Sequence, residues 1–349
     1  MNIKGITGKL HQFRQLLILF ALCALLTILL PGVFLTAGNF RSILYAISLQ
    51  GIMICGATFP VLVGGIDRTV SGVAALGGAI CCTIIAKSGF TSQSVVLGMF
   101  MGVAIGALSG VLHGIVLAHF NIPAFLLTLA TSQILYGFVQ TVTGNQLINV
   151  MQAKAFTQLG SARLFEIPIP VYILFVCFGI SYFLLNKTVY GRQLYFVGGN
   201  REAARLSGIS SKKVIIIAYM ISGVMAAISG LLLSSMNQQA SAMQAMGYEN
   251  DVLAAIVVGG ISLRGGQGSI FGAMFGALLI GILTNGMQLL GIESVYHDLI
   301  KGVIIIAAIA ADMYSSYKMS GLQHGGFFKW LMRFRTTMQP GKSQLRKSV

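Results

Sequence analysis

Charged residues are scarce in this chain. Asp, Glu, Lys and Arg make up only 9% of its 349 residues, and just 8 of them are acidic. Soluble domains carry about 25% charged residues, and no hydrophilic stretch here is long enough to form a core of its own. The chain is 56% hydrophobic, and its mean hydropathy is +0.84. The composition excludes a soluble protein and predicts an all-α polytopic membrane protein.

The sequence also lacks the motifs of catalysis. No G-x-x-x-x-G-K-[ST] pattern occurs, and the glycine-rich segment 264–269 has no Lys-Ser/Thr pair, so it is interpreted as a tight turn between spans. The five histidines form no catalytic grouping, and the five cysteines lie in apolar runs without metal-ligand spacing. We therefore expect no enzyme activity, cofactor or metal. ATP hydrolysis, if the function needs it, belongs to a separate subunit.

Apolar runs long enough to cross a bilayer recur along the chain. About 20 apolar residues span the hydrocarbon core. Ten candidate spans follow, some of them short or broken: 16–36, 42–63, 69–87, 94–118, 122–143, 168–186, 213–236, 250–262, 269–290 and 297–317. Segment 250–262 is short and could instead be re-entrant.

The distribution of Lys and Arg predicts the topology. The net charge is +15, and the bias of cations towards the cytoplasm explains it better than nucleic-acid binding does. Ten spans place both termini in the cytoplasm: residues 1–15 before a transmembrane domain 16–317, and a basic tail 318–349 that contacts anionic lipid. A re-entrant 250–262 would move the basic tail outside, which the bias opposes.

Glycines repeat every four residues in one span. Residues 98, 102, 106, 110 and 114 are all glycine, and a shorter row occupies 268, 272 and 276. Such rows let another helix approach closely. The segments VLVGGI (61–66) and IVVGGI (256–261) resemble each other. This similarity indicates either an internal repeat, as in many transporters, or chance among glycine-rich apolar segments.

One polar segment, 187–213, separates two groups of spans. It carries six cations and one anion, Glu202, which places it in the cytoplasm. A short helix is expected from Asn200 to Leu206, closed by Gly208. Its position between membrane spans suits a joint to another subunit.

Few ionisable residues fall inside the spans, and none is expected at mid-membrane. Asp67 follows two glycines at a span end, and Asp298 and Lys301 are three residues apart and could pair on one helix face. A path for a solute therefore depends mainly on neutral polar groups. The candidates for this path are Asp67, Gln133, Tyr136, Asn237, Asn285 and Gln288.

Four stretches resemble the permease subunit of ribose-type ABC sugar importers. They are GGIDRTVSGVAALGG (64–78), IPAFLLTLAT (122–131), YGRQLYFVGGNREAARLSGIS (190–210) and GYENDVLAAIVVGGISLRGGQGSIFG (247–272). The resemblance runs from about residue 40 to about 310. It implies a permease in a plasma membrane, the bacterial inner membrane, that imports a small sugar such as a ribose-like monosaccharide.

The resemblance also implies partners: an ATP-binding subunit, a solute-binding protein and a second permease copy, identical or not. Glu202, Ala203 and Ala204 match the family's cytoplasmic coupling helix. One departure is notable, because the family usually has Leu after the Asp of G-G-I-D, whereas Arg68 stands here. Asp67 and Arg68 are expected to neutralise each other in part.

Two other functions remain open from the sequence. An ion-coupled secondary carrier for a small polar solute would need a titratable or sodium-binding site at mid-membrane. A structural scaffold would not need the cytoplasmic loop. On the outer side, the longest loop, 144–167, holds Lys154 and Arg163 against the single anion Glu166. These two cations are the expected docking residues for the solute-binding protein.

Overall fold

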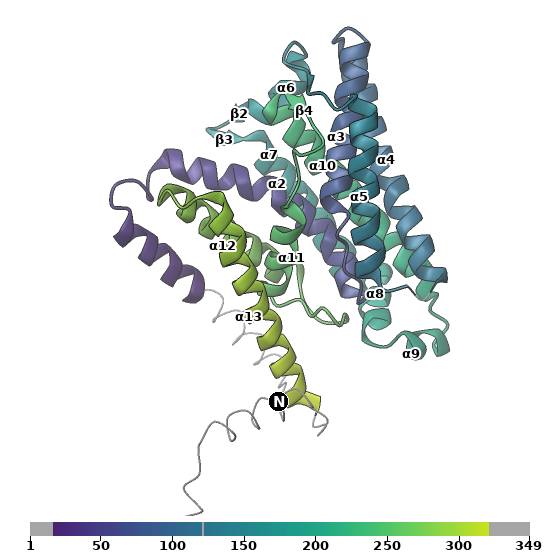
Figure 1. The fold of residues 1–349 in the computed structure, drawn as a ribbon. Helices are drawn as coiled ribbons and strands as arrows, with labels where there is room; N and C mark the ends of the chain where they lie inside the picture. The colour runs from purple at the N-terminus through teal and green to yellow at the C-terminus, as the bar shows by residue number, and fades with distance from the viewer. Residues whose placement is uncertain (1–16, 121, 321–349) are drawn as a thin grey trace, which may run out of the picture. The chain divides into compact units, whose positions relative to one another are not determined.

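A computed structural model describes residues 17–120 and 122–320, and these residues are mainly helical (Figure 1). The N-terminal segment 1–15 and nearly all of the tail 318–349 lie outside the described residues. Residues 1–305 form one compact unit and 306–349 a second. The account below concerns the first.

Among the described residues, seven of the ten expected spans are helices long and apolar enough to cross a membrane. They are α2 (Ala37–Leu62), α3 (Val70–Lys87), α4 (Ser92–His119), α5 (Ala124–Thr143), α7 (Ile169–Lys187), α10 (Ser211–Asn237) and α12 (Ile270–Leu289). The expected span 297–317 falls within α13 (Ser294–Ser320). In segment 16–36 the described helix runs from Leu17 to Leu29.

The segment expected to span at 250–262 is a shorter helix. Helix α11 (Tyr248–Val258) has 11 residues, a length of about 17 Å, whereas the bilayer core is about 30 Å thick. The residue before it, Gly247, has a φ of 92°, which is open to glycine but costly for other residues. An irregular stretch, 241–247, precedes it. Helix α11 is therefore too short to cross the bilayer core on its own.

Helix α10 packs against α4 along the glycine row. A Cβ atom added at Gly106 would lie 2.5 Å from the carbonyl oxygen of Gly223, and one added at Gly110 would meet the backbone of Tyr219. Gly102 instead approaches Gly77 of α3. The row thus forms the close helix contact that its spacing predicts. Gly272 and Gly276 pack in the same way against α11.

Three glycines, Gly198, Gly265 and Gly266, closely approach the backbone at the end of α2. The amide of Gly266 donates to Leu62 O at 2.8 Å. Cβ atoms added at Gly198 and Gly265 would collide with Leu62 and Gly64 respectively. The two similar motifs 61–66 and 256–261 both end helices near this junction, and the segment 264–269 is the tight turn expected between α11 and α12.

The two ends of α10 carry different structures. Before Ser211 lie α8 (Val189–Gly199) and α9 (Arg201–Leu206), and α8 was not expected. The short elements at the other end of α10, near Asn237, are α6 (Lys154–Ser161), β1 (Ile148–Asn149), β2 (Arg163–Leu164), β3 (Ile167–Pro168) and β4 (Gln239–Ala240). Strand β1 pairs with β4, and β2 with β3, both antiparallel. The Gly160 amide donates to Ser235 Oγ at 2.7 Å and ties α6 to this end of α10.

Candidate functional site

Asp67 lies in the non-helical segment between α2 and α3. This segment turns towards the interior of the protein. One carboxylate oxygen accepts from the Thr69 amide (2.9 Å) and hydroxyl (2.6 Å), and the other from Ser222 Oγ (2.6 Å). Ser222 is about 17 Å along α10 from one end and about 22 Å from the other. Asp67 is only 8% exposed. Asp67 lies between two candidate spans, as expected, but the chain turns into the helix bundle after Gly64 and buries its carboxylate.

Arg68 does not neutralise Asp67. Its Nη2 lies 3.4 Å from Glu249 Oε1 and donates to Asn250 Oδ1 at 3.1 Å. Its guanidinium carbon lies 5.7 Å from the centre of the Phe125 ring, which is a cation–π geometry. The cation that departs from the family pattern therefore has partners at the start of α11, far away in sequence.

A second ion pair joins α11 to α13. Lys301 Nζ lies 2.8 Å from Asp251 Oδ1, and Gln50 Nε2 donates to Asp251 Oδ2 at 2.8 Å. Gln50 stands halfway along α2. The expected pairing of Lys301 with Asp298 was wrong, because Lys301 is buried while Asp298 is exposed.

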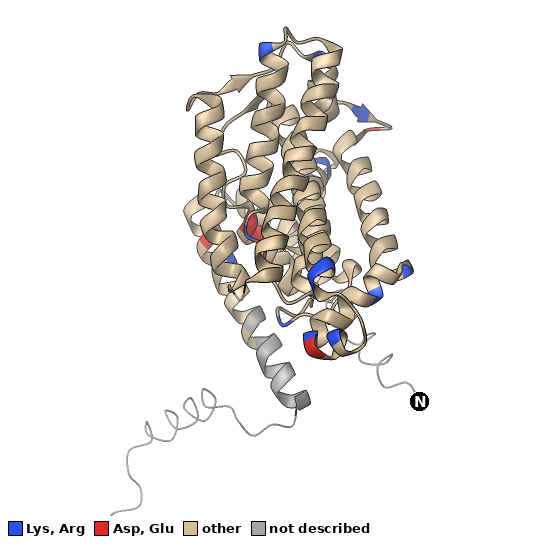
Figure 2. Ribbon diagram, turned by 90° about the vertical axis from the view of Figure 1, so that its right-hand side faces the viewer, with Lys and Arg blue, Asp and Glu red and all other residues tan. Residues whose placement is uncertain are grey.

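These five residues, Arg68, Glu249, Asn250, Asp251 and Lys301, form what we call the central charged site. Figure 2 shows charged residues within the helix bundle as well as at its α9 end. The sequence did not show that these charges gather, whereas in the fold Asp251 accepts a hydrogen bond from Gln50, halfway along α2. Glu249 and Asp251 lie in the first turn of α11, where the helix dipole favours anions. Burying these charges is tolerable because each has an opposite partner.

The other path candidates do not gather in one cavity. The Tyr136 hydroxyl is buried and has no hydrogen-bond partner among the described residues. It is close enough to Arg68 and Glu249 to interact with their charges. Gln133 and Gln288 are exposed on α5 and α12. Asn285 is buried, and its Nδ2 donates to Asn39 Oδ1 at 2.8 Å.

The sixth path candidate, Asn237, lines a polar cavity of about 450 Å³ near α6. Of the residues that line this cavity, the sequence alone indicated only Asn237 and Arg163 as functional candidates. The cavity also presents Arg41, Ser42, Tyr45, Gln244 and Tyr248. Amides, hydroxyls and the two arginine side chains offer hydrogen-bonding groups to a polar solute. These residues come from three separate segments, so no local pattern announced them.

The expected docking cations are exposed at this same end. Lys154 begins α6, and Arg163 begins β2. The loop's anion, Glu166, is 2.8 Å from Arg41 Nη1. Because Arg41 offsets Glu166, the surface around Lys154 and Arg163 is more positive than the loop sequence alone suggests.

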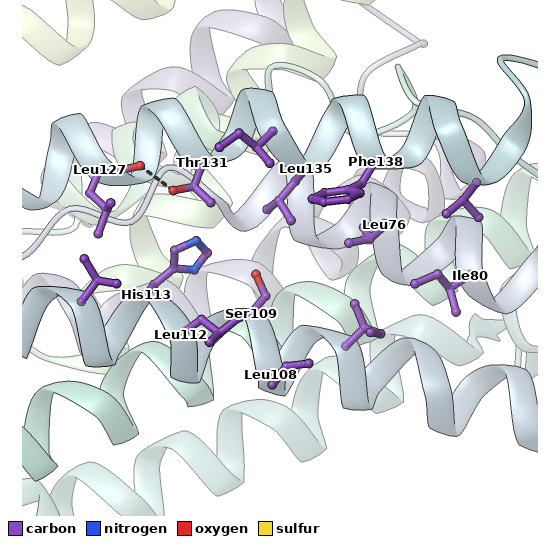
Figure 3. Close-up of a pocket in the computed structure, with 14 residues that line it drawn as sticks. Leu76, Ile80, Leu108, Ser109, Leu112, His113, Leu127, Thr131, Leu135 and Phe138 are labelled. Atoms are coloured by element: carbon purple, nitrogen blue, oxygen red, sulfur yellow. Dashed lines mark hydrogen bonds between the residues drawn. The ribbon is translucent and has the colours of Figure 1, made fainter.

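A separate cavity of about 510 Å³ lies between α3, α4 and α5 (Figure 3). Its lining is apolar except for Ser109, His113 and Thr131. Thr131 already donates to Leu127 O at 2.7 Å. An apolar lining of this kind does not suit a hydroxylated solute.

Helix α9 is built as its sequence predicts. Asn200 caps it by accepting from the amides of Glu202 and Ala203, both at 3.0 Å, and Gly208 ends it with φ 76°. Arg205 lies 2.6 Å from Glu202, and its hydrogen bond and charge hold the pKa of Glu202 below the ordinary value. Ala204 is fully buried, so it anchors α9 to the protein.

The exposed side of α9 is both charged and apolar. Leu206 is 76% exposed. All six cations of segment 187–213 are exposed as well: Lys187, Arg192, Arg201, Arg205, Lys212 and Lys213. A leucine surrounded by cations is a surface suited to a protein partner with acidic groups.

Residues 39–309 match the family described as "Branched-chain amino acid transport system / permease component". The chain belongs to this permease family. The permease is 34% identical over 316 residues to the ribose import permease protein RbsC of Haemophilus influenzae, covering 88% of this chain and 95% of the relative. It is 33% identical over 307 residues to the L-arabinose transport system permease protein AraH of Escherichia coli K12, covering 88% and 92%. No solved structure matches.

The family and the helices together describe a multi-pass plasma membrane protein. The permease is a transport component rather than an enzyme. Among the described residues, no group of three or more His, Cys, Asp or Glu side chains is placed to hold a metal ion.

Proposed function

We propose that this permease is the membrane-spanning subunit of an ATP-driven importer for a small sugar. The observation that carries the proposal is its similarity, over nearly nine-tenths of the chain, to permeases named for ribose and for L-arabinose. Both relatives are named for aldopentoses. An aldopentose or a closely related small molecule is therefore the proposed cargo.

Two partners act on opposite ends of α10. The ATP-binding subunit docks on α9 through Leu206 and the surrounding cations. The solute-binding protein docks near Lys154 and Arg163, beside the polar cavity. A second permease copy completes the path, and anionic lipid contacts the basic tail.

The solute path runs from the polar cavity to the central charged site. Charges inside a membrane protein normally face the bundle interior or a water-filled path. Discontinuous helices form solute sites in many transporters, and α11 is too short to cross the bilayer core on its own. An ion-coupled carrier is the weaker alternative, because protein donors already occupy the two buried aspartates, Asp67 and Asp251.

The experiment that tests the function is uptake into proteoliposomes. The permease is reconstituted with its ATP-binding subunit, and the solute-binding protein is added outside with radiolabelled D-ribose or L-arabinose. We expect uptake of at least one pentose that requires both ATP and the binding protein. Uptake without ATP that an ionophore abolishes would establish the carrier instead.

The role of α9 has its own test. Leu206→Glu places a negative charge on the exposed side of α9, and uptake and ATPase stimulation should both fall while membrane insertion is unchanged. Leu206→Met is the matched control, since it keeps an apolar side chain at the same exposed position and adds no charge. Full ATPase stimulation in Leu206→Glu would exclude α9 as the docking helix.

The ten-span topology with both termini in the cytoplasm predicts opposite sides for α6 and α9. Cysteines introduced at the exposed residues Ser161 and Ser207 should differ, and an impermeant thiol reagent should label only Ser161→Cys in intact cells. Four native cysteines are buried, so background labelling is low. Labelling of both positions would contradict this topology.

A further inference from the structure

The hairpin formed by β2 and β3, residues 163–168, presents an apolar tip to solvent. Phe165 is 87% exposed, and its neighbour Leu164 is 53% exposed. The hairpin lies at the end of the fold opposite α9 (Figure 1). Single exposed apolar residues are common on protein surfaces, so exposure alone does not indicate a function. The backbone of this tip distinguishes it from an ordinary exposed residue.

The tip has a backbone conformation that its residues disfavour. Leu164 pairs with Ile167, so Phe165 and Glu166 form a two-residue turn. Both turn residues have a positive φ, 48° and 64° respectively. Turns with two positive φ values normally contain Asn, Asp or Gly, and a bulky residue in such a position is an outlier. The stability of the turn therefore does not explain a phenylalanine here.

Neighbouring contacts hold the turn in this conformation. Glu166 Oε2 accepts a hydrogen bond from Arg41 Nη1 at 2.8 Å. The Tyr172 hydroxyl donates to Leu164 O at 2.9 Å. Strained backbone persists where the surrounding structure enforces it, and it concentrates at functional sites. The hairpin is therefore a fixed support that presents Phe165 outward.

The hairpin is unsuited to the hydrocarbon core of a membrane. It is a sheet of two strands with two open edges, and open sheet edges do not occur in contact with lipid. Beside Phe165, the Glu166 side chain is 78% exposed, and a carboxylate in lipid is costly. Phe165 therefore lies in water unless a protein covers it.

The position of the hairpin indicates which protein that is. Arg163 in β2 and Arg41 in α2 both line the polar cavity. A protein that holds the hairpin tip therefore sits beside this cavity, where a delivered solute would enter the proposed path. Lys154 and Arg163 are exposed and suit acidic groups around an apolar centre, which is the usual arrangement of a protein interface.

We propose that Phe165 is the apolar anchor by which the solute-binding protein holds the permease. The ring enters an apolar pocket of the binding protein, and Lys154 and Arg163 contact acidic groups around that pocket. This inference rests on the proposed function and deepens it, because it names the residue that contributes most to docking on this surface. The fixed shape of the hairpin positions the partner over the cavity.

The test uses the complex of permease and ATP-binding subunit in lipid nanodiscs, with pentose-loaded solute-binding protein. Phe165→Gly removes the ring and relieves the backbone, since glycine accepts a positive φ. The binding-protein concentration that gives half-maximal ATPase stimulation should rise about 30-fold, equivalent to about 2 kcal/mol. Saturating binding protein should restore the maximal rate. The difference should persist at high salt, because salt screens the cations but not an apolar contact.

Two further variants separate an anchor from a packing residue. Phe165→Leu keeps a large apolar side chain and should remain within about threefold of the wild type. Phe90→Gly is the matched control, because Phe90 also has a positive φ, 61°, but packs against the core. Phe90→Gly should lower the thermal unfolding midpoint and leave docking unchanged, whereas Phe165→Gly should keep or raise the midpoint. A lower midpoint together with lost docking in Phe165→Gly would make Phe165 a packing residue, and the proposal would fail.

A fluorescent label identifies what covers this position. Phe165→Cys is labelled with bimane in a Cys23→Ala background, since the other four native cysteines are buried. We expect emission typical of water that shifts to the blue when binding protein is added. Blue-shifted emission without binding protein would overturn the proposal. Quenching by spin-labelled lipid would then identify a membrane contact, and its absence would identify the second permease copy.

The remaining outcomes distinguish the anchor from the proposed function. If binding protein neither stimulates the ATPase nor supports pentose uptake in the wild type, the proposed function fails and the anchor fails with it. If the wild type responds and Phe165→Gly matches it at every binding-protein concentration, the anchor alone is wrong.

Discussion

Replacing Gly106 by Leu tests the packing of α4 on α10. A Cβ atom at this position would lie 2.5 Å from both Ala227 Cβ and Gly223 O. Carbon atoms in good contact are about 3.5–4.0 Å apart, so the helices must separate by about 1 Å before the rest of the leucine is placed. The obstacle includes a backbone carbonyl of α10, which cannot rotate away as a side chain could.

The expected cost follows from this geometry. Overpacking a well-packed interior costs about 1–3 kcal/mol and occasionally more, and the rigid contact places Gly106→Leu at about 3 kcal/mol. Gly137→Leu is the matched control. A Cβ atom at Gly137 of α5 has nothing within 4 Å, so only helix propensity changes, by less than about 1 kcal/mol and in the stabilising direction.

The assay is thermal unfolding of both purified variants in the same detergent, followed by loss of the monodisperse peak in size-exclusion chromatography. Gly106→Leu should lower the midpoint clearly, and Gly137→Leu should leave it unchanged or raise it. Equal midpoints for the two variants would refute the close contact of α4 with α10. Transport by Gly106→Leu at the wild-type rate and stability would place the glycine row against lipid.

Three other perturbations have defined outcomes. Asn200→Ala removes the cap of α9 and should destabilise this helix by about 1 kcal/mol, seen as faster amide hydrogen exchange within α9 only; unchanged exchange would contradict the capping role. Lys154→Glu with Arg163→Glu should slow uptake mostly at low binding-protein concentration and reduce its salt dependence; an unchanged concentration and salt dependence would exclude this docking surface. Lys301→Met leaves the buried Asp251 carboxylate without its partner and should lower the free energy of unfolding by about 3–5 kcal/mol, measured as lost folded yield. Adding Asp251→Leu should restore the yield, and no recovery in the double variant would contradict the pairing.

Local sequence determined the elements whose stability is local. The long apolar runs gave the seven membrane-length helices, since a helix is the only open-ended structure that satisfies its own backbone in lipid. The four-residue spacing of glycine placed all five glycines on one face of α4, whichever helix packs against that face. Asn200 and Gly208 set both ends of α9, because caps act within a few residues of themselves.

Only the tertiary structure decided where the charges are. The sequence paired Asp67 with Arg68 and Lys301 with Asp298, because spacing along the chain was all it offered. The break after α2 instead turns inward to Ser222, and Lys301 reaches Asp251 across the bundle. Buried charges take whichever partner lowers their desolvation cost. Which partner that is depends on how helices far apart in sequence come together, and the pattern of residues within one segment does not contain it.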